Sequence, residues 1–309
     1  MRKTVIAVLI CGVVVGGIFA LLRRQSVIRP DQQLNPNTIR VTTSFYPLYF
    51  FSKEVGGDKV QVTNITPPGA EPHDYEPTTQ DMVSIQKSNI LLINGNVEPW
   101  AQKVTANIAG SNVKILVAGE GLFTQTITEE GEVTPDPHIW LSPRLAKQEV
   151  TRIAETFKEV DPSAAEYFDA NAANLLKRLD ELDQAYRGGL SQCKSQEIIT
   201  AHAAFGYMAS EYGLEQVAIA GLSPDEEPSP RELADVAKFA KQKNIQYIFF
   251  EQLVSPKLAE TIAAEIGAKT LVLDPLEGIS DADMSQGKDY FSVMKQNLEN
   301  LQIALQCTK

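Results

Sequence analysis

Short apolar segments alternate with amphipathic helical segments along the chain, and this alternation constrains the fold more than any other feature. The segments expected to form strands are 39–44, 60–65, 90–94 and 113–117 in the first half and 197–200, 216–220, 246–250 and 270–273 in the second. Expected helices fall between them, at 47–55, 78–87, 203–212, 230–243, 256–266 and 286–306. Such alternation is typical of parallel sheets covered by helices, so we predict an α/β fold with mostly parallel sheets.

Four helix starts are marked by a capping residue followed by proline. The pairs are Ser142-Pro143, Asp161-Pro162, Ser229-Pro230 and Ser255-Pro256. Proline suits the first helical position because its missing N–H is not needed there. The second pair precedes an expected long helix at 163–188, which Gly188 and Gly189 should end. At 1.5 Å per residue this helix would be about 39 Å long, enough to join two domains and hold them at a fixed separation.

The N-terminus has the pattern of an export segment. Residues 4–22 are an uninterrupted apolar run, preceded by Arg2 and Lys3. Two interpretations stay open for residues 1–30: a signal peptide cut after Ala20, or an uncleaved membrane anchor beside Arg23 and Arg24. In either case we expect the rest of the protein in the periplasm or otherwise outside the cytoplasm. A polar linker at 31–38 would precede the folded part.

Composition and missing motifs exclude several classes of function. The net charge is −11, and five basic residues without an acidic one lie before or at position 29, so the remaining chain is more acidic still. A chain of that charge lacks the basic face that nucleic-acid binding needs. The sequence has no P-loop, no G-x-S-x-G and no C-x-x-C motif. It therefore shows no motif that would indicate nucleotide hydrolysis, hydrolysis by a catalytic serine, or dithiol chemistry.

Two cysteines, Cys193 and Cys307, lie outside the N-terminal segment. An even pair in an exported protein favours a disulfide. This bond would tie the C-terminal tail to the start of the second half. The alternative is a pair of free thiols.

Three histidines, His73, His138 and His202, all lie at predicted turns. In an α/β sheet, functional groups are presented near the carboxyl ends of strands and in the loops that follow them. Imidazole suits zinc, copper, nickel and iron, and three imidazoles need one more ligand to close a tetrahedral site. Asp274 and Glu251 each follow a buried strand and are both candidates, and position along the chain alone does not choose between them.

Several motifs in order resemble one known family. They are SFYPLYFFSKEVGGD, GAEPHDYEPTTQD, ILLINGNVEPW, DPHIWLSP, TAHAAFGYMASEYGL and TLVLDPLEG, between Ile39 and Cys307. The chain is similar to the ZnuA-like metal-binding subunits of bacterial zinc and manganese ABC importers, a group that includes metal-binding adhesin-type lipoproteins.

This resemblance implies two βα lobes, 39–160 and 191–309, joined by one rigid helix within 161–190, with a metal buried in the cleft between them. It implies the ligands His73 and His138 from the first lobe, and His202 and Asp274 from the second. Glu251 then becomes a candidate for orienting a ligand rather than binding the metal itself.

Histidine at position 202 favours Zn²⁺, because manganese-specific relatives usually carry glutamate there; Mn²⁺ or iron is the alternative. Many zinc importers have a His-rich loop before the second ligand. Here residues 119–137 hold four acidic residues near their end and no histidine: Glu129, Glu130, Glu132 and Asp136. We expect a solvated loop, with a weak acidic metal gatherer as the alternative.

The expected function is high-affinity extracytoplasmic binding of zinc and its delivery to an ABC permease, by a monomer that is not an enzyme. Two other functions are kept as alternatives. One is a zinc-dependent extracellular hydrolase, in which Glu251 would serve as the general base. The other is a metal-stabilised protein of cell adhesion.

Overall fold

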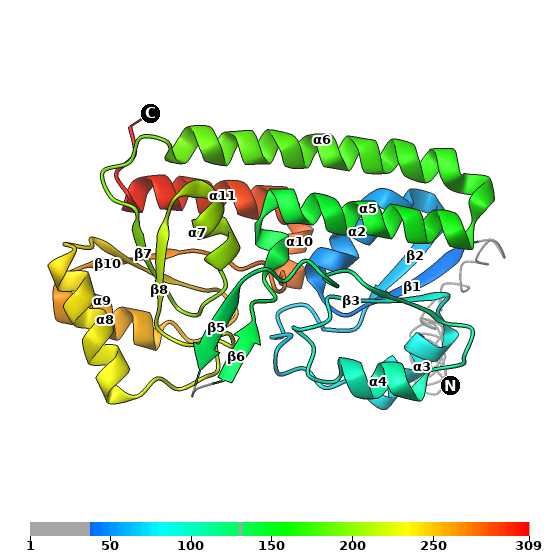
Figure 1. Cartoon of the computed structure of the whole chain (residues 1–309), viewed down its shortest axis with the longest axis horizontal. Helices are drawn as coiled ribbons and strands as arrows, with labels where there is room; N and C mark the ends of the chain where they lie inside the picture. The colour runs from blue at the N-terminus through cyan, green and yellow to red at the C-terminus, as the bar shows by residue number, and fades with distance from the viewer. Residues whose placement is uncertain (1–37, 130–131, 309) are drawn as a thin grey trace, which may run out of the picture. The chain divides into compact units, whose positions relative to one another are not determined.

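The computed structural model describes residues 38–129 and 132–308 (Figure 1). The described residues from Ile39 onward form one compact unit, and all that follows concerns it. The apolar run at 4–22 and most of the predicted linker lie outside the described residues. Within the described residues, no helix is both long and apolar enough to span a bilayer.

The first lobe is built on a four-stranded parallel sheet with the order β2-β1-β3-β4. Its strands are β1 (Ile39–Thr43), β2 (Val60–Asn64), β3 (Ile90–Ile93) and β4 (Lys114–Val117). Its helices are α2 (Tyr46–Gly56), the short 3-10 helix η1 (Gly57–Lys59), α3 (Thr79–Lys87) and α4 (Ala101–Asn107). The inner strand β3 is apolar throughout because Ile90 and Leu92 face one hydrophobic cluster while Leu91 and Ile93 face another.

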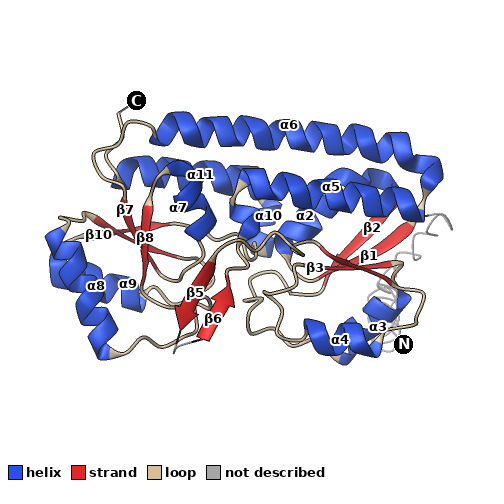
Figure 2. Ribbon diagram, in the orientation of Figure 1, coloured by secondary structure: helices blue, strands red, loops and turns tan. Residues whose placement is uncertain are grey.

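The second lobe contains two parallel pairs of strands. In one, β7 (Glu197–Thr200) pairs with β8 (Glu215–Ala218); in the other, β9 (Tyr247–Phe250) pairs with β10 (Lys269–Val272), and β7 lies next to β9. The helices are α7 (Gly206–Tyr212), α8 (Pro230–Gln242), α9 (Lys257–Ile266), α10 (Asp281–Ser285) and α11 (Tyr290–Ala304). Figure 2 shows helices around the strands of each lobe. The α/β class with parallel sheets is confirmed.

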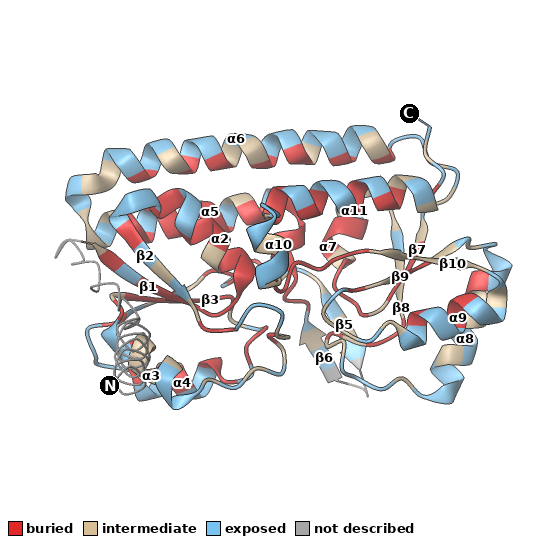
Figure 3. Ribbon diagram, turned by 180° about the vertical axis from the view of Figure 1, so that it is seen from behind, coloured by how far each residue is buried: buried red, intermediate tan, exposed pale blue. Residues whose placement is uncertain are grey.

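A long helix joins the two lobes. After η2 (Ile139–Leu141), α5 (Pro143–Val160) and η3 (Pro162–Ala164), the chain forms α6 (Ala165–Leu190). Helix α6 packs on α2 and α5 of the first lobe and on α11 of the second. Its buried residues form one stripe toward these helices (Figure 3). The predicted joining helix is therefore present, two residues further along the chain.

Gly188 and Gly189 do not end α6, which continues to Leu190. A Cβ atom at Gly189 would lie 2.5 Å from Nε2 of Gln302 and 3.2 Å from Cδ1 of Leu298, so the glycine leaves room for these two side chains of α11. Glycine here serves packing rather than termination, which explains why the predicted end was wrong.

The predicted caps are present at three of the four helix starts. Ser142, Asp161 and Ser229 each accept a hydrogen bond from a backbone N–H in the first helical turn. The fourth differs, since α9 begins after Pro256 and Ser255 does not cap it. Helices α4 and α10 were not predicted from the sequence, nor was an antiparallel hairpin of β5 (Thr126–Glu129) and β6 (Glu132–Pro135).

The predicted disulfide joins Cys193 to Cys307 across 114 residues of chain. It connects the segment that follows α6 to the segment that follows α11. A further link lies beside it, because the backbone N–H of Lys194 donates to the carbonyl oxygen of Leu305 over 3.0 Å. The bond therefore closes the second lobe at its two ends.

Replacing Cys193 with alanine should lower the free energy of unfolding of the metal-free protein by about 2–5 kcal/mol, because a cross-link over so long a loop restricts the unfolded chain. Urea unfolding of the oxidised wild type and of Cys193→Ala measures the difference. A reducing agent should destabilise the wild type and leave the variant unchanged. Equal unfolding midpoints for the oxidised wild type and the variant would contradict this expectation.

Candidate metal centre

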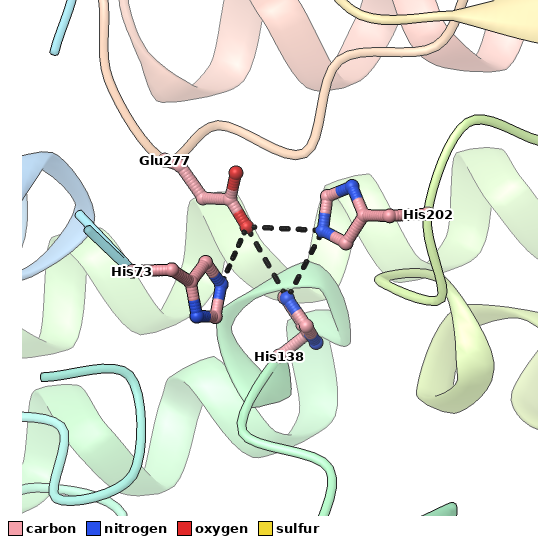
Figure 4. Close-up of side chains that lie close together, drawn as sticks. All are labelled: His73, His138, His202 and Glu277. Atoms are coloured by element: carbon pink, nitrogen blue, oxygen red, sulfur yellow. Dashed lines mark hydrogen bonds and ion pairs between the residues drawn. The ribbon is translucent and has the colours of Figure 1, made fainter. Parts of the chain in front are cut away.

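Four side chains converge on one point in the structure. They are His73, His138, His202 and Glu277, whose possible ligand atoms all lie within 4.8 Å of one another. Oε1 of Glu277 lies 3.3 Å from Nε2 of His73, 3.2 Å from Nε2 of His138 and 3.3 Å from Nε2 of His202. Figure 4 shows the three rings turned toward this one carboxylate oxygen. Three imidazole nitrogens and one carboxylate oxygen are a donor set suited to zinc.

Each lobe contributes two of these residues from loops at the carboxyl side of strands. His73 lies in the loop between β2 and α3, and His138 lies between β6 and η2. His202 follows β7, and Glu277 follows β10. For His73, His202 and Glu277 the preceding strands β2, β7 and β10 are parallel strands, whose carboxyl ends are where ligands are commonly bound in α/β folds, whereas His138 follows the antiparallel β5–β6 hairpin. The cluster therefore lies where the two lobes meet.

The cluster is almost completely removed from water. The side chains of His138 and His202 are 0% exposed and that of Glu277 is 1% exposed, whereas that of His73 is 9% exposed. A dry environment strengthens the interaction between a cation and its ligands. It also makes the orientation of each ligand important, because water cannot replace a misplaced group.

Two carboxylates hold the buried rings in place. Oδ1 of Asp136 accepts hydrogen bonds from Nδ1 of His138 over 2.8 Å and from its backbone N–H over 2.9 Å. Oε1 of Glu251 does the same for His202, at 2.7 Å and 3.2 Å. With the proton on Nδ1, Nε2 of each ring is left with its lone pair toward the cluster. The structure thus puts Glu251 behind His202, in contact with the side of the ring that does not meet the cluster.

The fourth member of the cluster is Glu277, not Asp274 as the resemblance implied. Oδ1 of Asp274 instead accepts the backbone N–H of Leu276 over 2.8 Å, and the Asn297 side chain bonds both the N–H and the carbonyl of Asp274. Asp274 also lines a cavity of about 360 Å³ on the α11 side of its loop. It shapes the turn that presents Glu277.

The turn between Asp274 and Glu277 has an unusual backbone conformation. Leu276 has a φ of 59°, in the left-handed region that non-glycine residues rarely adopt. Such strained backbone persists only where the surroundings enforce it, and it is common at functional sites. The only sequence signal for Glu277 is a second carboxylate three residues after Asp274 in LDPLEG, and periodicity does not reveal which of the two points inward.

The segment 119–137 is not simply a solvated loop. It contains the β5–β6 hairpin, and Asp136 at its end is 1% exposed. The Tyr207 hydroxyl on α7 donates to the carbonyl of Asp136 over 2.9 Å and accepts the N–H of Thr124 over 3.1 Å. The segment is therefore bound to the second lobe and supplies the carboxylate that orients His138.

The charges of the cluster are mutually dependent. Burial alone would lower the pKa of His202, but the carboxylates of Glu251 and Glu277 outweigh it and raise this pKa well above its usual value. The pKa of His138 is also raised, by Asp136 and Glu277 against the opposing effect of burial. Burial would raise the pKa of Glu277, but the surrounding histidines hold it well below its usual range. Without metal, the raised pKa values of His138 and His202 favour the protonated form of these two rings beside the Glu277 carboxylate.

Comparison with known proteins gives a consistent result. Residues 41–304 match the family model described as "Zinc-uptake complex component A periplasmic". The chain is 40% identical over 279 residues to the high-affinity zinc uptake system protein ZnuA of Bacillus subtilis, covering 86% of this chain and 88% of that protein. It is 39% identical over 283 residues to the zinc-binding lipoprotein AdcA of Streptococcus pneumoniae, covering 88% of this chain but 56% of that longer protein.

Solved structures agree in fold. The Zn(II)-bound ZnuA-like domain of Streptococcus pneumoniae AdcA matches 87% of this chain and 99% of that domain, with 40% identity and a TM-score of 0.75. The laminin-binding protein Lmb of Streptococcus agalactiae, described as bifunctional with adhesin and metal transporting activity, matches 86% of this chain and 99% of that chain, with 32% identity and a TM-score of 0.77.

The stability of the metal-free protein should fall between pH 6 and 9. Burial raises the pKa of Asp274 to about 7, that of Glu149 to about 8 and, together with the nearby Glu277 carboxylate, that of Glu71 to about 9, and the carboxylates of Glu251 and Glu277 raise the pKa of His202. In each case the folded protein holds a proton that the unfolded chain releases earlier as the pH rises, so stability is lost up to the pKa of the folded state.

Zinc displaces protons from its histidine ligands, so the increase in melting temperature caused by a fixed excess of zinc should grow over the same interval. Melting temperatures with and without zinc from pH 6 to 9 measure both trends. A metal-free melting temperature that rises over this range, or a zinc increment that does not change, would contradict the expectation.

Proposed function

Because the chain belongs to the family of periplasmic zinc-uptake components, we propose that His73, His138, His202 and Glu277 bind a zinc ion for delivery to the membrane permease of an ABC importer. The observation that carries this proposal is the convergence of three Nε2 atoms on one carboxylate oxygen, at 3.2–3.3 Å. All four side chains come from a single chain, which supports a monomer as the working form.

The donor set supports zinc over manganese. Zinc favours four-coordinate sites with imidazole and carboxylate ligands, whereas manganese is better suited to carboxylate, carbonyl and water oxygens. Here three of the four donors are nitrogen. Asp136 and Glu251, behind two of the rings, add negative charge close to the ion without supplying further ligands.

A hydrolytic function lacks support in the arrangement of these groups. A catalytic zinc site keeps one position open for water and needs a general base nearby. Glu251, the candidate base from the sequence, has one oxygen engaged by the N–H and Nδ1 of His202, on the side of the ring away from the cluster. We therefore propose that the protein carries zinc rather than using it in catalysis.

The distribution of ligands suggests how the ion is released. The first lobe holds His73 and His138, and the second holds His202 and Glu277. A small separation of the lobes would remove two ligands at once and expose the ion to water. Because α6 packs on both lobes, we expect tilts and loop shifts rather than wide opening.

The proposal is tested with chelator-stripped protein, residues 31–309, melted with zinc, manganese, iron or cadmium. A metal that binds only the folded state raises stability by RT ln(1 + [L]/Kd), so at equal concentration the order of the shifts reports the order of affinity. We expect zinc to give a larger shift than manganese or iron. No shift with zinc would contradict the proposal.

Glu277→Gln and Asp274→Asn form a matched pair within this test. Each removes one charge from the same loop, but only the first removes a proposed ligand. We expect Glu277→Gln to weaken zinc binding by at least the 10–100-fold typical for loss of a group that supports a ligand, and to prevent growth of the source cells under zinc limitation. Asp274→Asn keeps the oxygen that accepts the Leu276 N–H and should bind nearly normally. Nearly normal zinc binding by Glu277→Gln together with weak binding by Asp274→Asn would contradict the proposal and identify Asp274 as the ligand.

A further inference from the structure

One buried side chain connects the loop of His138 to the loop of Glu277. The indole Nε1–H of Trp140 donates a hydrogen bond to the carbonyl oxygen of Pro275 over 2.7 Å. Trp140 is two residues after His138 on the first lobe, and Pro275 is two residues before Glu277 on the second. A short hydrogen bond without access to water therefore joins the two loops directly behind the cluster.

The position of the indole is fixed from several sides. The carbonyl oxygen of Trp140 accepts the hydroxyl of Tyr290 on α11 over 2.6 Å. Its ring packs edge-on against Phe45, with centroids 4.7 Å apart, and lies 5.2 Å from the ring of His138. The side chain is fully buried, so it cannot follow a displaced Pro275 without disturbing the ring of His138.

The loop that receives this hydrogen bond is also fixed at its start. The side chain of Asn297 accepts a hydrogen bond from the backbone N–H of Asp274 and donates one to its carbonyl oxygen. The carboxylate of Asp274 in turn accepts the N–H of Leu276. The carbonyl of Pro275 then connects this loop to the first lobe through Trp140. This contact therefore fixes the loop at a point two residues before Glu277.

The carboxylate of Glu277 is presented with one oxygen only. Oε1 faces all three Nε2 atoms, whereas Oε2 is buried and has no hydrogen-bond partner among the described residues. One oxygen with three nitrogens completes a four-coordinate site. A carboxylate free to turn would offer both oxygens, and manganese is the ion better served by additional oxygen ligands.

We propose that Trp140 is a specificity-determining positioning residue, which favours zinc over manganese by holding Glu277 as a one-oxygen ligand through the Pro275 carbonyl. This inference rests on the proposed function of the cluster. It assigns to the indole N–H a role in selectivity beyond the packing role that any large aromatic ring would fill.

The variant Trp140→Phe tests this role, because it keeps an aromatic ring beside Phe45 and His138 but removes the N–H. We expect the dissociation constant for zinc to rise by about 10-fold, the lower end for loss of a supporting contact. The constant for manganese should rise less or fall, so the ratio of the two affinities decreases. Binding is measured by competition with a chelator, and folding is checked by circular dichroism.

Trp100→Phe is the matched control. Trp100 is also buried, in the cluster between the first sheet and α4, and its indole makes no hydrogen bond to any residue that the structure describes. The Trp100→Phe variant should lower the free energy of unfolding without changing the ratio of the zinc and manganese affinities. The visible spectrum of bound Co²⁺ adds a readout of coordination geometry, which should change in Trp140→Phe and stay as in the wild type in Trp100→Phe.

A second variant keeps the proposal testable if Trp140→Phe does not fold. Tyr290→Phe removes the hydroxyl that holds the Trp140 carbonyl and should shift the ratio of affinities in the same direction, by a smaller amount. Wild-type ratios and Co²⁺ spectra in every folded variant would overturn the role of Trp140 while leaving zinc binding intact. Failure of the wild type to bind zinc would instead overturn the proposed function.

Discussion

The arrangement of the molecule depends on one electrostatic requirement, which is to hold a doubly charged ion away from water. Burying a charge is costly unless opposite charge and good ligand geometry accompany it. The cluster meets this requirement with Glu277 in contact and with Asp136 and Glu251 behind two of the rings. Without metal, the raised pKa values of His138 and His202 favour protonated rings, whose positive charge would replace part of the charge of the ion beside these carboxylates. Metal and protons thus compete for the same buried positions.

The fold serves this requirement by bringing four distant segments together. Parallel strands place His202 and Glu277 at one edge of the second lobe, and the loop after β2 and the end of the β5–β6 hairpin bring His73 and His138 to meet them. Helix α6 holds the two lobes side by side, and buried hydrogen bonds from Trp140 and Tyr207 cross between them. The geometry of the metal centre is therefore a property of the interface between lobes.

Much of this was accessible from the sequence, because it depends on local patterns. Apolar periodicity located the strands and most helices, proline pairs located helix starts, and a lone cysteine pair indicated the disulfide. The three histidines stood out because they are few and lie at turns. Glu277 was missed because LDPLEG offers two carboxylates three residues apart, and periodicity does not reveal which of them lies in the cluster. The hairpin before His138 was missed because its strands are short and largely polar, and the burial of Asp136 depends on Tyr207, 71 residues away.

Anomalous diffraction at the zinc edge, from crystals of zinc-loaded protein, tests the central claim most directly. We expect one strong peak between the two lobes, with Nε2 of the three histidines and one oxygen of Glu277 at about 2.0–2.2 Å and no water bound to the metal. A peak coordinated by Asp274, one with an open position occupied by water, or one away from the histidines would contradict a closed site of three histidines and Glu277.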